Sequence, residues 1–243
     1  RAALGVVIAL LSRHFPDQGI AAVGHRIVHG GATFAAPVVL DDGAIATLHR
    51  LESHAPLHQP HNLAGVAAAR AAFPGAPQIG CFDTAFHRTQ PWVADTYALP
   101  RAYYDRGIRR YGFHGLSYEY LAAELGRVAP AVAAGRVIAA HLGNGASLCA
   151  MRAGRAVATT MGFSPLDGLA MGTRCGQIDP GVLLYLSEHD GLDAKALGAL
   201  LNRESGLKGL SGLGHDVRAL ESAGTPAATG ALDYFVHRVV REC

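Results

Sequence analysis

The sequence predicts an α/β fold. Short apolar runs that end in polar loops alternate with runs whose apolar residues recur at helical spacing, as expected when strands and helices alternate. The 243 residues are 50% apolar and 16% charged, and 30 glycines and 12 prolines mark many turns. This length allows one large domain or two ordinary ones, and the composition is typical of an α/β enzyme rather than of a disordered or coiled-coil chain.

The first predicted elements are a helix, a strand and a second helix. Residues 4–11 form an apolar helical run, and residues 20–23 form a short buried-strand candidate whose end delivers Arg26 to a loop. Residues 38–40 then lead into a helix that begins near residues 41–42. In α/β folds ligands bind at the ends of strands, although a polar residue there is often just a hydrogen-bonded residue of the core.

Three histidines interrupt this pattern. His54, His58 and His61 have the spacing of helical metal ligands, but Pro56 and Pro60 prevent a continuous helix. A zinc site needs ligands that converge in space. We therefore predict a rigid loop here rather than a metal site.

The next elements are a capped helix and a strand. Asn62 is expected to cap a helix over residues 63–73, and residues 78–82 form a strand that ends at Asp83. A carboxylate just past a strand end is well placed for catalysis and equally well placed to cap a turn.

An irregular stretch at residues 89–107 is the expected boundary between two domains, residues 1–88 and residues 89–243. Beyond it, Ser117 is expected to cap a helix. His114 would then lie beside a helix N-terminus, where backbone donors and the helix dipole favour an anion.

Glycines follow a strand candidate at residues 137–140. His141, Leu142, Gly143, Asn144 and Gly145 lie between this run and the strand candidates at residues 147–151 and 157–160. The glycines therefore occupy a turn between strands, unlike the two familiar phosphate loops that open into a helix. Such a turn can present backbone N–H groups to a phosphate, and it can equally be an ordinary Asn-Gly β-turn.

The last third combines Gly-rich loops with capped helices. Residues 161–176 form a long loop without periodicity, whose apolar residues argue against disorder. Asp179 and Asp193 are expected to cap two helices, and residues 209–218 to form a second Gly-rich loop. A terminal helix has one apolar face, made of Leu232, Phe235, Val236, Val239 and Val240.

Charge and cysteine content narrow the functional classes. The net charge of +2, with dispersed Lys and Arg, argues against nucleic-acid binding through a basic face. The four cysteines form no close pair, so neither a disulfide framework nor a zinc knuckle is indicated. No apolar run is long enough for a membrane span and no signal-peptide pattern is present, so we expect a cytoplasmic protein without a membrane partner.

The candidate functional residues all lie in loops marked by glycine or proline. They are Arg26, His58, Asp83, His114, Asn144 with its flanking glycines, Arg174, Asp216 and Arg218. Two arginines, two histidines and a carboxylate that converge would suit phosphoryl transfer, because that reaction depends on positioning and on neutralising oxygen charge. Each residue alone has a surface or capping explanation, so only the combination favours this chemistry.

Six segments of the chain resemble acetate kinases, in the same order and at similar spacing. They are Gly24-His-Arg-Ile-Val-His-Gly-Gly31, Ala55-Pro-Leu-His58, Phe82-Asp-Thr-Ala-Phe-His87, Tyr111-Gly-Phe-His-Gly115, His141-Leu-Gly-Asn-Gly145, and Met161-Gly-Phe through Gly172-Thr-Arg-Cys-Gly176. The resemblance implies an actin-like (ribonuclease H-like), two-lobed fold of the acetate and sugar kinase, Hsp70 and actin superfamily. It implies the reversible reaction of ATP with acetate to give ADP and acetyl phosphate.

The resemblance also implies residue roles. Arg26 would hold the substrate carboxylate, Asp83 would be the catalytic acid/base or a positioning carboxylate, and His114 and Arg174 would stabilise the transferring phosphoryl group. His58 would support that site. The pocket for the methyl group would be formed by Val28, Leu57, Phe113 and Pro165. The nucleotide would be bound by His141, Leu142, Gly143, Asn144, Gly145, Asp216, Val217 and Arg218.

The chain departs from the family pattern at both ends. It contains neither the Asn-x-Gly-Ser-Ser-Ser-like hairpin with which family members begin nor their later Gly-Ile-Gly-Glu-Asn-like loop and magnesium-linked glutamate. We therefore expect an internal fragment whose Mg²⁺ ligands lie outside it, from a homodimeric parent. A propionate or butyrate kinase and a non-catalytic nucleotide-binding relic remain alternatives.

Overall fold

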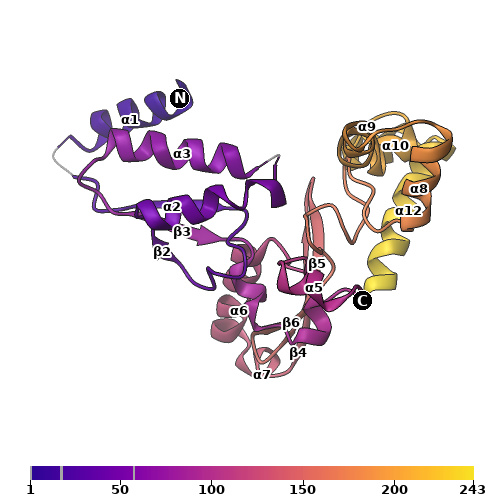
Figure 1. Cartoon of the computed structure of the whole chain (residues 1–243), viewed down its shortest axis with the longest axis horizontal. Coiled ribbons are helices and arrows are strands. Elements are labelled where there is room, and N and C mark those ends of the chain that lie inside the picture. The colour runs from indigo at the N-terminus through magenta and orange to yellow at the C-terminus, as the bar shows by residue number, and fades with distance from the viewer. Residues whose placement is uncertain (1, 17–18, 57) are drawn as a thin grey trace.

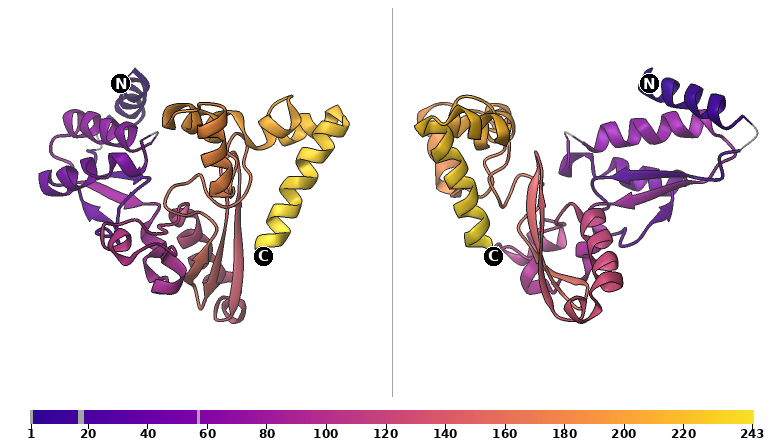
Figure 2. Two further views of the ribbon diagram at one scale, coloured as in Figure 1. Left: turned by 45° about the vertical axis from the view of Figure 1, so that its right-hand side comes forward. Right: turned by 180° about the vertical axis from the view of Figure 1, so that it is seen from behind.

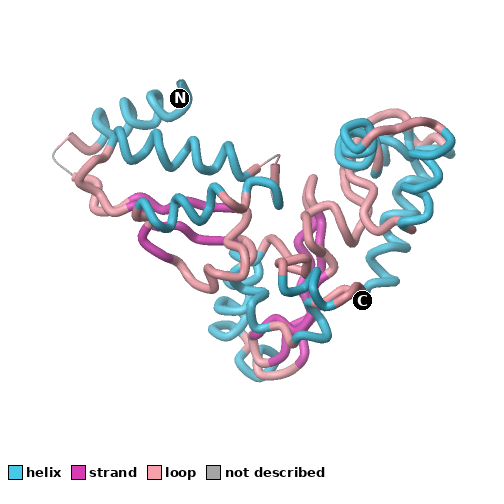
Figure 3. The backbone as a smooth tube through the Cα atoms, viewed as in Figure 1, coloured by secondary structure: helices cyan, strands magenta, loops and turns pink. Residues whose placement is uncertain are grey.

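The computed structural model describes residues 2–16, 19–56 and 58–243. Its elements follow chain order along the molecule: a first sheet with three helices, a second sheet, and a group of helices that ends at the C-terminus (Figure 1). Figure 2 shows the first sheet and the C-terminal helices on opposite sides of the second sheet. Figure 3 shows that loops occupy the region where these three parts meet.

The first sheet has the strand order β1-β3-β2. Strands β1 (Val23–Ile27) and β3 (Gln78–Phe82) are parallel, and β2 (Val38–Val39) is antiparallel to β3. The predicted strand at residues 78–82 is thus confirmed. Because β1 and β3 run parallel, Arg26 and Asp83 lie at the same end of the sheet.

Three helices accompany this sheet: α1 (Ala2–His14), α2 (Asp42–His49) and α3 (Gln59–Ala72). Helices α2 and α3 pack on each other, and α3 also contacts β1 and β3. The buried core between them includes Ile27, Leu48, Val66 and Phe82. The helices predicted at residues 4–11 and near residues 41–42 are confirmed.

Two expectations for this part of the chain were wrong. Strand β1 begins at Val23, later than the predicted run, so Arg26 lies inside the strand rather than in the loop that follows it. Asn62 does not cap a helix, because α3 already begins at Gln59, with Pro60 in its first turn. The Asn62 side chain instead accepts a hydrogen bond from the backbone N–H of Val28, at 3.0 Å.

A short helical segment, η1 (Glu52–His54), lies between α2 and α3. Three more lead from the first sheet towards the second: η2 (Ala85–Thr89), α4 (Trp92–Asp95) and α5 (Arg101–Asp105). Helices α6 (Gly115–Val128) and α7 (Pro130–Ala133) follow. The N-cap of α6 is His114 and not Ser117, which was wrongly predicted to hold that position.

The second sheet is an antiparallel meander in the order β4-β5-β6. Its strands are β4 (Arg136–Leu142), β5 (Ala146–Arg152) and β6 (Arg155–Thr159), which confirms the three predicted strands. The β4–β5 hairpin rises between the first sheet and the C-terminal helices in Figure 1. At the β5–β6 turn, Ala153 and Gly154 both have positive φ, at 49° and 74°.

The C-terminal part is helical. It contains α8 (Pro180–His189), α9 (Ala194–Ala199), the π-helix η3 (Leu200–Glu204), α10 (Gly206–Ser211), α11 (Val217–Ala223) and α12 (Pro226–Glu242). Asp179 and Asp193 cap α8 and α9 as predicted. None of the helices formed by the described residues is both long and apolar enough to cross a membrane.

One expectation for the C-terminal part was wrong. The predicted loop over residues 209–218 contains the end of α10 and the start of α11. On α12, Phe235 and Val239 pack against buried core residues, but Val236 and Val240 are exposed. Helix periodicity places residues on a face without specifying which part of that face the neighbouring elements cover.

The loop over residues 161–176 has no helix or strand but lies in the core. Met161, Leu169 and Met171 are buried against Tyr111 and Phe113. The loop is therefore held by packing, which confirms the expectation that it is not disordered.

Candidate functional site

Residues from both sheets and from the buried loop meet around one cavity of about 330 Å³. Ten of the predicted site residues line it: Arg26, Val28, His58, Asp83, Phe113, His114, His141, Gly145, Pro165 and Arg174. The lining combines arginines and imidazoles with the apolar side chains of Val28, Phe113 and Pro165. The cavity is thus suited to a small anion with a short apolar part.

Arg26 and Asp83 form a bidentate ion pair across the first sheet. The Arg26 Nε and Nη2 atoms donate to the two carboxylate oxygens of Asp83 at 3.0 and 2.7 Å. The hydrogen bond to Asp83 raises the pKa of Arg26. The Asp83 side chain is 1% exposed and the Arg26 side chain 65%, so the buried carboxylate orients the guanidinium while its Nη1 end stays available to a ligand.

His114 is held in an unusual backbone conformation at the start of α6. Its φ of 58° and ψ of 19° are left-handed, a region that non-glycine residues rarely occupy and that is often found at functional sites. The next residue, Gly115, donates its N–H to the backbone oxygen of Asp83 at 2.8 Å. This bond ties the histidine to the end of strand β3.

The His114 imidazole is neutral. Burial, together with the nearby His141, Arg26 and Arg174, lowers its pKa to about 3. The rings of His114 and His141 stack, with centroids 4.0 Å apart, and burial also lowers the pKa of His141. A neutral imidazole beside two arginines can donate a hydrogen bond to an anion without adding a charge.

Two buried residues that sequence reasoning missed orient the His114 ring. Its Nδ1 lies 2.8 Å from Ser147 Oγ, and Tyr118 Oη lies 2.8 Å from the Ser147 carbonyl oxygen and 2.6 Å from its Oγ. When Tyr118 donates to the carbonyl, the serine hydroxyl is free to donate to Nδ1. The ring proton then resides on Nε2, the nitrogen on the side of Gly145.

Arg174 reaches the same place from the buried loop. Its Nη1 donates to the backbone oxygen of Pro165 at 2.6 Å, and burial lowers its pKa. A Cβ built on Gly145 would lie 3.3 Å from both Arg174 Nη2 and His114 Nε2. Glycine at position 145 therefore leaves room between these two donors.

The turn that follows β4 is only partly inside the cavity. His141 and Gly145 line it, whereas Leu142, Gly143 and Asn144 are exposed outside it. The Gly143 N–H donates to the Gly145 oxygen at 3.0 Å, as in a tight hairpin turn. The turn thus has one half-buried side that faces the cavity and one exposed side.

Asp216, Val217 and Arg218 do not line the cavity. The Asp216 carboxylate caps α11 by accepting from the backbone N–H groups of Arg218 and Ala219. A Cβ on Gly172 would meet the side chains of both Asn144 and His215, so the segment that leads to Asp216 lies close to the exposed side of the turn.

Two further residues singled out from the sequence, Leu57 and Asn62, have different outcomes. Leu57, expected in the apolar pocket, lies outside the described residues. Asn62 lines the cavity although it was predicted only as a helix cap. The hydrogen bond that it accepts from the Val28 N–H joins residues 34 apart in the sequence, which no local pattern signals.

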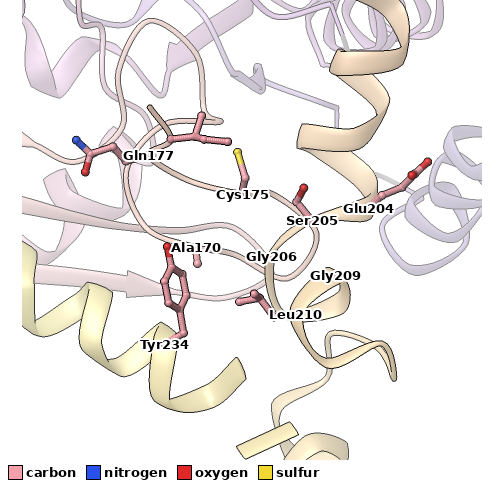
Figure 4. A pocket seen from close by; sticks show the side chains of 10 residues that line it. Ala170, Cys175, Gln177, Glu204, Ser205, Gly206, Gly209, Leu210 and Tyr234 are labelled. Carbon is pink, nitrogen blue, oxygen red and sulfur yellow. The ribbon is translucent and has the colours of Figure 1, made fainter. Parts of the chain in front are cut away.

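A second hollow, of about 350 Å³, lies behind the buried loop (Figure 4). Cys175, Ser205 and Tyr234 are among the residues that line it, and none of the predicted site residues is. Burial raises the pKa of the Cys175 thiol, whose hydrogen is donated to the Gly176 oxygen. A protonated, bonded thiol is a weak nucleophile, so we assign no chemistry to this hollow.

The described residues do not form a metal site on their own. Within residues 2–16, 19–56 and 58–243, no three His, Cys, Asp or Glu side chains are grouped closely enough to hold a metal ion. Among the described residues that line the cavity, Asp83 is the one carboxylate, and both of its oxygens are bonded to Arg26. The arrangement therefore does not fit a protein-bound Mg²⁺ by itself.

Two solved kinases share this fold over almost the whole chain. An acetate kinase from Porphyromonas gingivalis matches with a TM-score of 0.90 and 39% identity, over 99% of this chain and 63% of that one. A propionate kinase from Francisella tularensis subsp. tularensis matches with a TM-score of 0.93 and 36% identity, over 98% of this chain and 63% of that one. The fold is therefore that of the actin-like kinases.

The sequence comparisons are more specific. The model of the acetokinase family matches residues 2–243. An acetate kinase from Methylocella silvestris is 57% identical over 240 residues, which are 99% of this chain and 59% of that protein. The chain belongs to the acetokinase family, and it spans less than two thirds of the length of the relatives named here.

Proposed function

We propose that the natural protein that carries this sequence is an acetate kinase, which transfers a phosphoryl group reversibly between ATP and acetate. The observation that carries the proposal is the convergence of Arg26, His114 and Arg174 with an apolar wall around one small cavity. In this reaction an acetate oxygen attacks the γ-phosphorus, the bond from that phosphorus to the β-phosphate oxygen breaks, and ADP leaves. Acetate is already ionised at neutral pH, so the attack needs no base.

The proposed roles follow from the contacts of each residue. Arg26 binds the substrate carboxylate through its free Nη1 end, and Asp83 positions Arg26. His114 and Arg174 stabilise the charge that spreads over the transferring phosphoryl oxygens, because both present donors beside Gly145. His58 supports this site. Val28, Phe113 and Pro165 enclose the methyl group, and Leu57, which lies outside the described residues, is assigned to the same pocket by the family resemblance alone.

The nucleotide side of the proposal rests on the turn after β4. Backbone N–H groups of His141, Leu142, Gly143, Asn144 and Gly145 would bind phosphates, and the Asp216, Val217 and Arg218 segment would bind the remainder of the nucleotide. Mg²⁺ enters as the companion of ATP. We also propose a division into residues 1–88 and 89–243, and a homodimer formed through the second of these units.

A propionate or butyrate kinase is the second candidate, supported by the similarity to a solved propionate kinase. One methylene changes discrimination in an apolar pocket by only about 1–3 kcal/mol, so the motifs do not separate the two activities. The third candidate is a nucleotide-binding relic.

The test is formation of the acyl hydroxamate from acetate, propionate or butyrate with ATP, Mg²⁺ and hydroxylamine. We expect the highest kcat/KM with acetate. A higher value with propionate or butyrate would replace the proposal with the second candidate. ATP binding without any acyl phosphate would favour the relic.

Replacing Arg26 should mainly weaken carboxylate binding. We expect Arg26→Ala to raise the KM for acetate by roughly 10- to 100-fold, the effect of losing a hydrogen bond to a charged group, with a smaller change in kcat. Steady-state kinetics with varied acetate measure both constants.

The matched control for this change is Arg70→Ala, which removes an arginine from a surface ion pair with Asp42 and should leave both constants unchanged. A KM for acetate that stays constant in Arg26→Ala would remove Arg26 from substrate binding.

Ser147 is expected to act as a positioning residue through His114. Ser147→Ala removes the Nδ1 partner and should lower kcat by about tenfold, the effect of one net hydrogen bond, with little change in the KM for either substrate. Ser147→Thr, which keeps the hydroxyl, should restore most of the turnover. Equal losses in the alanine and threonine variants would point to a packing role instead.

A further inference from the structure

A third cavity, of about 580 Å³, adjoins the candidate site. It lies between η1, the loop at residues 163–166 and the α9–η3 segment, and we call it the α9 cavity. Its walls are mostly apolar and include Ala55, Phe163, Leu166 and Ala199. Its volume falls in the range of pockets that bind small organic molecules.

The charged groups of the α9 cavity all have one sign. Lys195 and Arg203 line it and are exposed, and none of its lining residues in the described part of the chain is a carboxylate. His54 also lines it, and burial lowers the pKa of this imidazole, so its ring is neutral. An apolar interior with two cations at its edge suits an anion that carries an apolar body.

The α9 cavity is physically connected to the candidate site. His58 and Pro165 line both cavities, and the Pro165 oxygen accepts the hydrogen bond from Arg174. The π-helix η3 is also fastened to the residues on either side of Arg174. Thr173 Oγ1 donates to the Asn202 oxygen at 2.9 Å, and the Cys175 N–H donates to the Leu201 oxygen at 3.0 Å.

We propose that the α9 cavity is a second binding site, for a small monocarboxylate whose apolar body is larger than that of acetate. The apolar lining receives the body, and Lys195 and Arg203 pair with the carboxylate. Single π-helical turns inside helices often occur at functional sites, and here the π-helix contributes Asn202 and Arg203 to the lining.

The test uses octanoate as the probe and calorimetry as the measurement. Gly198 lines the α9 cavity, and a Cβ built on it meets no heavy atom within 4 Å. Gly198→Leu therefore fits helix α9, improves its helix propensity and fills open space in the cavity. We expect it to weaken octanoate binding by at least about tenfold. Gly126→Leu, at an exposed and equally open helical glycine of α6, is the matched control and should leave octanoate binding unchanged.

Charge and location are tested separately. The double variant Lys195→Ala/Arg203→Ala should weaken octanoate binding by roughly three- to tenfold, whereas binding of octan-1-ol should not change. Unaltered octanoate affinity in Gly198→Leu would overturn the proposal. Loss of octanoate binding in Arg26→Ala with none in Gly198→Leu would also overturn it, because octanoate would then occupy the candidate site. Calorimetry measures binding and not turnover, so this result is independent of the acetate kinase activity.

Discussion

The Arg174→Ala variant is expected to lower turnover by roughly 10²–10³, the loss that follows removal of one preorganised donor from a transition state. The guanidinium is half-buried, and its Nη2 lies on the same side of Gly145 as His114 Nε2. In such a water-poor place a fixed cation stabilises developing phosphoryl charge more strongly than water does. Hydroxamate formation at saturating ATP and acetate measures the change.

Two controls separate catalysis from folding. Arg174 also holds the Pro165 oxygen, so its removal could loosen the loop over residues 161–176. Arg174→Lys keeps the charge but loses the planar fork, and it should recover only part of the turnover. Arg127→Ala, on the surface of α6, should have no effect on turnover. Near wild-type turnover in a folded Arg174→Ala variant would contradict the proposed role.

Acidification is expected to destabilise the protein strongly below neutral pH. His29 and His87 are fully buried, and burial lowers their pKa values to about 3 and about 4. Their Nδ1 atoms already accept hydrogen bonds, from the Gly31 N–H and from Gln90 Nε2. Protonation would therefore break these bonds and leave a charge in the core.

The sign and size of this effect follow from proton linkage. Between the ordinary histidine pKa of about 6.5 and the lowered folded values, the unfolded chain binds more protons than the folded one. The free energy of unfolding therefore falls as the pH drops through this window and is unaffected above it. From pH 7 to pH 5 we expect a loss of about 2 kcal/mol for each of the two histidines.

Urea unfolding at pH 7 and pH 5 measures this loss. His87→Gln should be less stable than the wild type at pH 7 and should lose about 2 kcal/mol less between the two pH values. His49→Gln, at an exposed position in an ion pair with Glu52, should leave the pH dependence unchanged. The same free energy of unfolding at both pH values in the wild-type protein would contradict the prediction.

Local patterns in the sequence predicted most of the elements near the candidate site. The strands at residues 78–82 and around the turn at residues 141–145, the helix that begins near residues 41–42, and the helix caps Asp179 and Asp193 were all predicted correctly or nearly so. These features depend on residues close in the sequence. Strands and helices follow from the spacing of apolar residues, and a cap makes its hydrogen bonds within one turn. The motifs likewise identified ten residues that line the candidate cavity.

The tertiary structure decided how those residues are paired. Asp83 bonds Arg26 across 57 residues, Ser147 orients His114 across 33, and Asn62 bonds Val28 across 34. No sequence period links such pairs, because their proximity depends on strand register and on how the helices pack. The N-cap of α6 was likewise not identified by local spacing. The sequence pointed to Ser117, whereas the structure places His114 at that position.

The sequence by itself therefore determined the α/β class, the family resemblance and the identity of the charged groups. Only the tertiary structure decided that Asp83 forms an ion pair with Arg26, that Asp216 caps α11, and that the α9 cavity shares Pro165 with the candidate site. The physical reason is that residue type and local spacing are properties of the chain, whereas burial, ion pairing and shared walls require segments distant in sequence to meet.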